Sequence, residues 1–219
     1  MNDFVVVAYY TPGSIYEEYA RNLVHSCEAQ NISYKVVPVP DRGSWERNTS
    51  FKPTFLRQVI DKVAPVPIVY VDADAIFCRP PTLFTDLAKD SNVHLAAHLL
   101  DHNLYRRKGV APELLSGTVY LANNPTARYI LDEWIVICKE NPKMWDQVAL
   151  HRVAKKYGYF NLPPQYCMIF DYMESVKDPV IKHFQASREY KAKGMKRKHS
   201  DGPRRVDQHG TVRIRRVHG

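Results

Sequence analysis

The sequence predicts an α/β sandwich with a mainly parallel central sheet, and three observations support this. A run rich in β-branched residues, 66–71, is bounded by prolines and has the character of a buried central strand. Segments with strand and helix patterns alternate along the chain, as in folds built from parallel strands and crossover helices. With 219 residues, the chain is long enough for one domain with a large core.

The first predicted strand, residues 4–10, leads through a turn into a helix. We expect Ser14 to cap this helix, because Glu17 stands three residues further on, the spacing of a capping box. An apolar stripe at helical spacing supports the assignment. Its members are Ile15, Tyr19, Leu23 and Cys27.

A second strand is predicted at residues 34–39, where Pro38 and Pro40 close it. The polar segment 41–50 that follows is predicted to be a surface loop. Residues 51–63 then form a second predicted helix, with Pro53 in the first turn, where proline is tolerated.

The central strand at residues 66–71 is followed by a short predicted helix at 83–88 and a strand at 93–100. Residues 101–114 are long, polar and irregular, with the basic run 106–108 at their middle. Long loops in compact domains are often functional, so this segment is a candidate contact surface.

Residues 116–184 continue the alternation of strand and helix. A strand is predicted at residues 116–121, and helices at 125–140 and 145–157. Two short strands, 159–162 and 179–184, complete the predicted domain.

Charge divides the chain into a body and a tail. The net charge is +8, and residues 188–219 carry 11 Lys/Arg against 3 Asp/Glu, so residues 1–187 are neutral. We therefore expect a domain at 1–187 and a basic tail at 188–219 that either binds a polyanion, such as DNA or an anionic membrane surface, or is a disordered solubilising segment. The predicted DNA contacts are Lys196, Arg197, Lys198, Arg204, Arg205, Arg213, Arg215 and Arg216.

The four cysteines show neither CxxC pairing nor zinc-finger spacing. We expect reduced thiols packed in or near the core, as in a cytoplasmic protein. The first residues do not have the pattern of a signal peptide, and no window has the length and apolarity of an integral membrane segment.

The central strand ends in Asp72 and Asp74, one residue apart. In open α/β sheets, ligands bind beyond the carboxyl ends of the strands. Two hard oxygen donors there suit Mg²⁺ or Mn²⁺, with phosphate oxygens completing the coordination. The alternative is a pair of solvated turn aspartates, since aspartate is common in turns.

Five motifs, spread in order over residues 4–191, resemble those of GT-A-fold glycosyltransferases, in particular glycogenin-like and related bacterial enzymes that use nucleotide-diphosphate sugars. Ala186 stands where this family usually has a glycine. The matching segments are Asp72-Ala73-Asp74, Lys52-Pro53-Thr54-Phe55-Leu56-Arg57, Ser116-Gly117-Thr118-Val119, Asp146-Gln147 and the nine residues from His183 to Lys191.

The resemblance implies a GT-A-like αβα sandwich, a metal held by Asp72, Asp74 and His183, and a nucleotide-sugar donor such as a UDP-sugar. It places the base and ribose beyond the first strand, the diphosphate among basic side chains, and the donor sugar near the strand at 116–121. The implied donor-binding residues are Tyr9, Thr11, Tyr16, Lys52, Arg57, Ala73, Ser116, Gly117, Arg188 and Lys191.

The resemblance also implies that Asp146 and Gln147 face the anomeric carbon, as in the retaining members of the family. A carboxylate or amide there could stabilise an oxocarbenium-like transition state, or a carboxylate could act as nucleophile. An exposed aspartate that opens a helix, favourable to the helix dipole, is the alternative for Asp146.

Several functions are compatible with these residues. The first is transfer of a sugar to modified bases in DNA, as in some bacteriophage enzymes, in the cytoplasm of a bacterial or phage-infected cell. A bacterial glycan or a lipid-linked sugar at the membrane is the second acceptor. A nucleotidyltransferase would want a glycine-rich phosphate loop near the first strand, which residues 11–14 match poorly. The last alternative is a non-catalytic nucleic-acid-binding protein on the same scaffold.

Overall fold

The computed structural model describes residues 3–105 and 107–187. Contacts divide the chain into a compact unit, Met1–Gln185, and a second unit, Ala186–Gly219. The fold below is that of the first unit; the basic tail predicted at 188–219 lies outside the described residues.

A six-stranded sheet forms the centre of this unit, in the order β2-β1-β3-β6-β5-β7. β1 pairs in parallel with β2 and β3, β5 pairs in parallel with β7, and β6 runs antiparallel to both β3 and β5. The predicted mainly parallel sheet is therefore confirmed. The strands are β1 (Val5–Tyr10), β2 (Tyr34–Pro38), β3 (Ile68–Val71), β5 (Leu95–Leu100), β6 (Glu113–Leu121) and β7 (Phe160–Asn161).

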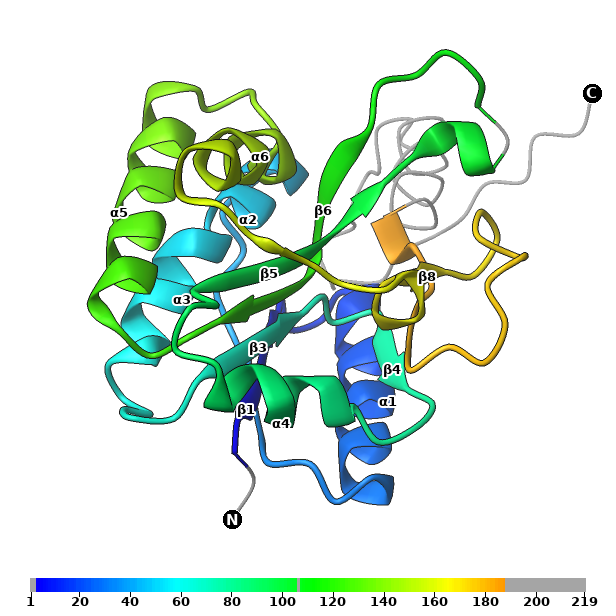
Figure 1. The fold of residues 1–219 in the computed structure, drawn as a ribbon. Helices are drawn as coiled ribbons and strands as arrows, with labels where there is room; N and C mark the ends of the chain where they lie inside the picture. Colours follow the sequence, from blue (N-terminus) through cyan, green and yellow to red (C-terminus); the bar gives the residue numbers. More distant parts are fainter. Residues whose placement is uncertain (1–2, 106, 188–219) are drawn as a thin grey trace, which may run out of the picture. The chain divides into compact units, whose positions relative to one another are not determined.

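Helices cover both faces of the sheet, which makes the three-layer sandwich visible in Figure 1. One face packs against α3 (Lys52–Ile60), α5 (Pro125–Glu140) and α6 (Asp146–Tyr157). The other packs against α1 (Ile15–Ala29) and α4 (Thr82–Lys89).

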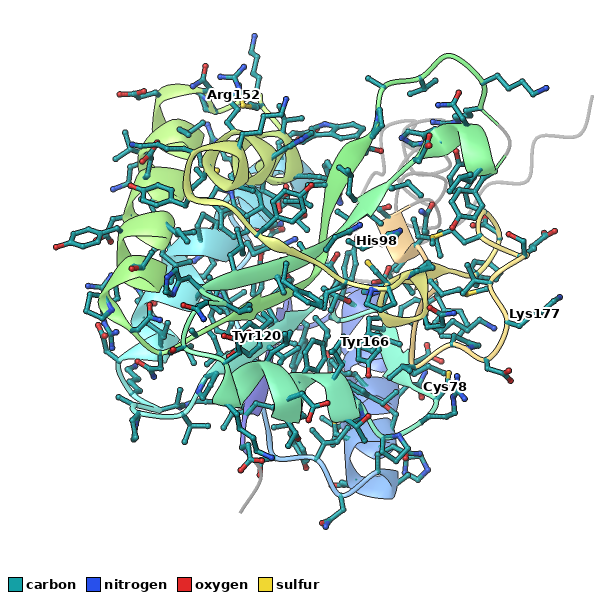
Figure 2. The ribbon with its side chains drawn as sticks, viewed as in Figure 1. Cys78, His98, Tyr120, Arg152, Tyr166 and Lys177 are labelled. Atoms are coloured by element: carbon teal, nitrogen blue, oxygen red, sulfur yellow. The ribbon has the colours of Figure 1, made fainter. Side chains whose placement is uncertain are left out.

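Alternation along β3 shows why a continuous apolar run was needed. Ile68 and Tyr70 belong to the core cluster of the α3, α5 and α6 face, whereas Val69 and Val71 belong to that of the α1 and α4 face. Because successive strand residues point to opposite faces, a strand covered on both sides has no solvent-facing position. Tyr120 of β6 is also buried, and its hydroxyl donates to the Leu87 carbonyl of α4 (3.1 Å). Cys78, in contrast, is exposed at the edge of the molecule (Figure 2).

A second, three-stranded sheet in the order β4-β9-β8 brings distant residues beside the end of β3. It consists of β4 (Ala75–Phe77), β8 (Met168–Ile169) and β9 (Ile181–His183). In the antiparallel pair of β4 and β9, Ala75 lies opposite His183. The sequence predicted β9 but neither β4 nor β8, because strands of two or three residues carry little periodicity.

Local capping signals were accurate. The Ser14 side chain accepts from the Tyr16 amide at the start of α1, and the Glu17 carboxylate reaches back to the Gly13 amide rather than to that of Ser14. α5 has the predicted bounds, begins at Pro125 and is capped by the Asn124 side chain.

Three expectations about local structure were wrong. The segment 41–50 is not all loop, since Ser44 caps a short helix, α2 (Trp45–Ser50), through the Arg47 amide. The segment 101–114 contains a 3₁₀ turn, η1 (His102–Leu104), and the first residues of β6, and a second 3₁₀ turn, η2 (Pro164–Tyr166), precedes β8. Cys78 is exposed, whereas Cys27, Cys138 and Cys167 are buried as expected, and all four are free thiols.

None of the described helices combines the length and apolar character that a membrane span requires.

Candidate functional site

The turn that carries Asp72 and Asp74 is fixed by backbone hydrogen bonds on three sides. The Asp72 amide donates to the Gly117 carbonyl of β6 (2.9 Å), and the Ala75 amide donates to the Asp72 carbonyl (3.0 Å). The Phe184 amide, just beyond β9, donates to the Asp74 carbonyl (3.0 Å). The two carboxylates therefore project from a rigid turn between the two sheets, and not from a solvated loop.

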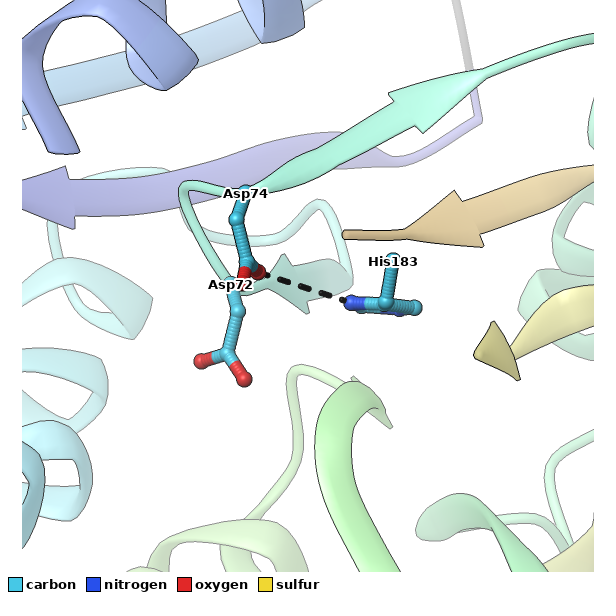
Figure 3. Close-up of side chains that lie close together, drawn as sticks. All are labelled: Asp72, Asp74 and His183. Atoms are coloured by element: carbon cyan, nitrogen blue, oxygen red, sulfur yellow. Dashed lines mark ion pairs between the residues drawn. The ribbon is translucent and has the colours of Figure 1, made fainter. Parts of the chain in front are cut away.

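Asp72, Asp74 and His183 lie together although more than a hundred residues separate the aspartates from the histidine. Each offers one ligand atom, and these atoms lie within 4.8 Å of one another. The Nδ1 atom of His183 is 3.9 Å from Oδ1 of Asp74, too far for a direct hydrogen bond (Figure 3). This spacing suits atoms that share a ligand, and two carboxylates with one imidazole suit a divalent cation such as Mn²⁺.

The hydrogen bond behind His183 orients its ring. The Oγ1 atom of Thr118, a fully buried residue of β6, lies 2.9 Å from Nε2 of His183, which leaves Nδ1 on the side of Asp74. Metal-binding histidines commonly have their second nitrogen held in this way.

Gly117 leaves the space that the three side chains share. A Cβ atom at this position would lie 3.2 Å from Cε1 of His183 and 3.3 Å from Oδ2 of Asp72, closer than ordinary van der Waals contact. The absence of a side chain here therefore keeps His183 and Asp72 in their positions, and the donor set fits the predicted metal.

Gly117→Ala is expected to weaken Mn²⁺ binding about tenfold, because the added methyl group pushes His183 and Asp72 apart. A Mn²⁺ titration followed by electron paramagnetic resonance measures this affinity. Gly117 does not have a positive φ angle, so the thermal midpoint should change little. An unchanged affinity would contradict the idea that this space holds the ion.

Lys52 connects Asp72 to a second buried carboxylate. Its Nζ atom lies 2.9 Å from Oδ2 of Asp146 and 3.2 Å from Oδ1 of Asp72. It also donates to the carbonyl and the hydroxyl of Ser116 (3.0 Å each), and that hydroxyl donates to Asp146 (2.8 Å). We call Lys52, Asp72, Ser116 and Asp146 the lysine cluster.

Within the lysine cluster, Lys52 and Asp146 are shielded from water, whereas 39% of the Asp72 side chain is exposed. Only 2% of Lys52 and 4% of Asp146 are exposed. Burial alone would lower the pKa of Lys52, but the carboxylates of Asp146 and Asp72 raise that pKa above its usual range. Lys52 therefore stays charged and compensates two carboxylates. The ammonium group of Lys52 is already bonded to Asp72, Asp146 and Ser116. Its predicted contact with a diphosphate therefore stays a prediction.

A chain of side-chain hydrogen bonds extends from the lysine cluster toward η1. Gln147 accepts from the Ser116 amide (3.3 Å) and donates to Glu113 (2.8 Å). Glu113 pairs with Nε2 of His102 (2.9 Å), whose Nδ1 lies 2.7 Å from the Tyr172 hydroxyl. Both ends of the Gln147 amide are therefore fixed, and Asp146 and Gln147 both contact Ser116. That they face an anomeric carbon stays a prediction.

Sequence reasoning missed Tyr70, Thr118, Glu113 and His102. One signal was available for the first two, because residues two apart on a strand share a face. Tyr70 stands two residues before Asp72, and its hydroxyl donates to that carboxylate (2.8 Å). Glu113 and His102 carried no such signal, because they meet only through tertiary contacts.

Of the three residues predicted to contact the base and ribose, Tyr9 lies near the end of β1, and Thr11 and Tyr16 follow that strand. Tyr9 packs edge to face on Phe51 and Phe55 and donates its hydroxyl to the Asn48 carbonyl of α2 (2.8 Å). Tyr9 is therefore a partly buried residue that packs against the hydrophobic core. Thr11 and Tyr16 are half-buried at the turn into α1. Ala73 is buried between the two aspartates.

The structure pairs Arg57 with carboxylates other than those of Asp72, Asp74 and Asp146, so its predicted contact with a diphosphate stays a prediction. Its guanidinium group pairs with Asp61 one turn further along α3 and with Asp132 of α5 (3.0 Å). Arg57 stands five residues after Lys52, so the two side chains leave α3 in different directions. Arg188 and Lys191 lie outside the described residues.

No family model matches the sequence, and a search of curated proteins found no match either. Solved structures do match. A glycosyltransferase involved in the glycosylation of the major capsid of the virus PBCV-1 superposes with a TM-score of 0.67 at 18% identity, covering 89% of this chain and 98% of that one. Mouse xyloside xylosyltransferase 1 superposes with a TM-score of 0.54 at 11% identity, covering 84% of this chain and 98% of that one.

A third match is the glycosyltransferase GlyE of Streptococcus pneumoniae, with a TM-score of 0.51 at 17% identity. It covers 83% of this chain, which spans only 54% of the GlyE chain. These similarities show that the chain has a glycosyltransferase fold, the GT-A-like αβα sandwich that the sequence predicted. At these identities they show the fold alone.

Proposed function

We propose that this protein is a metal-dependent glycosyltransferase that moves a sugar from a nucleotide-diphosphate sugar, such as a UDP-sugar, to an acceptor. The observation that carries the proposal is the group formed by Asp72, Asp74 and His183, placed at the end of β3 in a glycosyltransferase fold. In open α/β sheets this is where ligands bind.

Asp72, Asp74 and His183 would hold the cation, with Thr118 and Gly117 keeping the histidine in place. A divalent cation, Mn²⁺ or Mg²⁺, supplies Lewis-acid stabilisation of the negative charge on the leaving diphosphate. In the transfer, an acceptor hydroxyl oxygen bonds to the anomeric carbon and the bond from that carbon to the diphosphate breaks. The hydroxyl proton leaves with the released nucleoside diphosphate.

Asp146 is the proposed catalytic carboxylate. Its Oδ2 atom is held by Lys52 and by the Ser116 hydroxyl, so the charge has a fixed position. A fixed negative charge stabilises the positive charge that develops at the anomeric carbon without reorganisation. Gln147, held at both ends of its amide, is proposed to position Ser116 and thereby Asp146. We assign retention of configuration as part of this proposal.

The test is hydrolysis of a panel of nucleotide sugars, with and without Mn²⁺, by the unchanged protein and by Asp74→Asn. We expect Mn²⁺-dependent release of a nucleoside diphosphate from at least one donor, reduced by at least about a hundredfold in the variant. Asp86→Asn is the matched control, because Asp86 is an exposed aspartate on α4 and should leave the rate unchanged.

Two results together would overturn the proposal. The first is that no donor is hydrolysed, and the second is that Mn²⁺ promotes binding of none of them in calorimetry. The protein would then be a binding protein on a glycosyltransferase scaffold. The residues predicted to contact DNA lie outside the described residues.

A further inference from the structure

Two tryptophans from different helices pack against each other at the surface. Trp45 of α2 and Trp145, the N-cap residue of α6, meet edge to face, with ring centroids 5.9 Å apart and planes at 80°. Trp145 is 51% exposed, and Val148, one turn further along α6, is exposed too. Trp134, in contrast, is completely buried.

Both tryptophans belong to segments anchored at the proposed site. Trp145 directly precedes Asp146, so their Cα atoms are about 3.8 Å apart. On the other side, the Asn48 carbonyl of α2 accepts from Tyr9, whose ring lies 6.0 Å from that of Tyr70. Tyr70 in turn donates to Asp72. Trp145 is therefore next to the lysine cluster along the chain, and α2, which carries Trp45, is linked to that cluster through Tyr9 and Tyr70.

The arrangement is suited to binding a ring-shaped ligand. An edge-to-face contact is a favoured geometry for two aromatic rings, and it restrains both indoles before a ligand arrives. Side chains that are already restrained lose less conformational entropy when a ligand binds. The indole of Trp145 is half exposed, and its backbone is fixed one residue before Asp146, so it offers a prepared apolar surface.

We propose that Trp45 and Trp145 form the acceptor subsite and bind the apolar C–H face of a pyranose ring, so that the acceptor is a saccharide. This inference rests on the proposed function. A pyranose combines an apolar face with a rim of hydroxyl groups, and the exposed indole matches that face. One of those hydroxyls can then approach the anomeric carbon beside Asp146.

Charge around the pair favours a saccharide over a nucleic acid, whose bases also stack on aromatic rings. Binding of a phosphate backbone requires unpaired Lys and Arg side chains. In α2, Arg47 follows the acidic Glu46, and the charge of Lys52 is already compensated by Asp72 and Asp146. Counted over both segments that carry the pair, residues 41–50 hold two acidic and two basic side chains, and residues 139–146 hold two of each as well, exposed Lys143 included. Neither segment therefore carries the net positive charge that a phosphate backbone needs.

The experiment follows the three indole N–H signals in ¹H–¹⁵N NMR spectra of the full chain, which has three tryptophans. The probes are methyl glycosides of glucose, galactose, xylose and N-acetylglucosamine, the disaccharides maltose and lactose, and a ten-nucleotide oligo-dT. We expect at least one saccharide to shift the Trp45 and Trp145 signals saturably. The Trp134 signal, from an indole that donates to the Asp146 carbonyl, reports whether the fold is intact.

Variants separate binding from folding. Trp145→Ala and Trp45→Ala should each weaken the saccharide about tenfold. Tyr129→Ala is the matched control, because Tyr129 is an exposed aromatic residue on α5, and it should leave the affinity unchanged. If Trp145→Ala loses the Trp134 signal, Trp145→Phe is used in its place, because phenylalanine keeps an aromatic ring. Its affinity for the saccharide should lie between that of the unchanged protein and that of Trp45→Ala.

If oligo-dT shifts the Trp45 and Trp145 signals and none of the saccharides does, the inference is overturned in favour of base stacking. If none of the probes shifts these signals, it is overturned as well. Donor hydrolysis by the unchanged protein, measured without saccharide, tests the proposed function separately. Hydrolysis without indole shifts would overturn this inference alone. Indole shifts with neither donor hydrolysis nor Mn²⁺-promoted donor binding would support the saccharide site and contradict the proposed function.

Discussion

Asp146→Asn is expected to lower the rate of sugar transfer by about a thousandfold while the protein stays folded. Asparagine has the shape of aspartate and can still accept the hydrogen bond from Ser116, but it carries no charge to stabilise the anomeric carbon. Lys52 keeps Asp72 as a charged partner, so the lysine cluster is not left without a carboxylate. The measurement is kcat for Mn²⁺-dependent donor turnover, with the thermal midpoint as a folding check.

The matched control for this variant is Asp132→Asn. Asp132 also pairs with a cation, Arg57, but on the surface between α3 and α5, so its loss should leave kcat unchanged. If Asp146→Asn turned over the donor at the original rate, Asp146 would be only the counter-ion of Lys52, and the catalytic assignment would be wrong.

Lys52→Met is expected to lower the free energy of unfolding by about 3–5 kcal/mol. Methionine fills a similar volume, but it leaves the buried carboxylate of Asp146 without a cation and the Ser116 carbonyl without its donor. An uncompensated buried charge is among the most costly single changes in a protein. Urea denaturation at neutral pH measures the loss.

Lys156→Met is the matched control, since Lys156 pairs with Glu133 while 60% of its side chain is exposed. Exposed pairs contribute about 1 kcal/mol or less, so the control should lose little stability. The double variant Lys52→Met/Asp146→Asn should recover part of the loss, because it removes the unpaired charge. A cost for Lys52→Met no larger than that of Lys156→Met would show that the buried pair does not hold the fold together.

The sequence by itself determined the main layers of the fold. Ile68–Val71 had to be buried on both faces, because an unbroken β-branched run leaves no polar side for solvent. Ser14 and Pro125 marked helix starts correctly, because caps depend on a few neighbouring residues. Asp72 and Asp74 were located because they end the central strand.

The prediction that His183 joins Asp72 and Asp74 came from the resemblance to GT-A-fold enzymes, and the structure brings the three together through the pairing of β4 with β9. Neither strand has enough residues for a periodic pattern, so the sequence around His183 does not reveal its neighbours.

Only the tertiary structure decided what the charged side chains do. Lys52 and Arg57 lie on one short helix, yet Lys52 is buried between two carboxylates and Arg57 is paired at the surface. Glu113, His102 and Tyr172 come from three segments and meet through side-chain hydrogen bonds. Local patterns reflect interactions within a few residues, whereas these contacts depend on strand register and helix packing, which arise when distant parts of the chain come together.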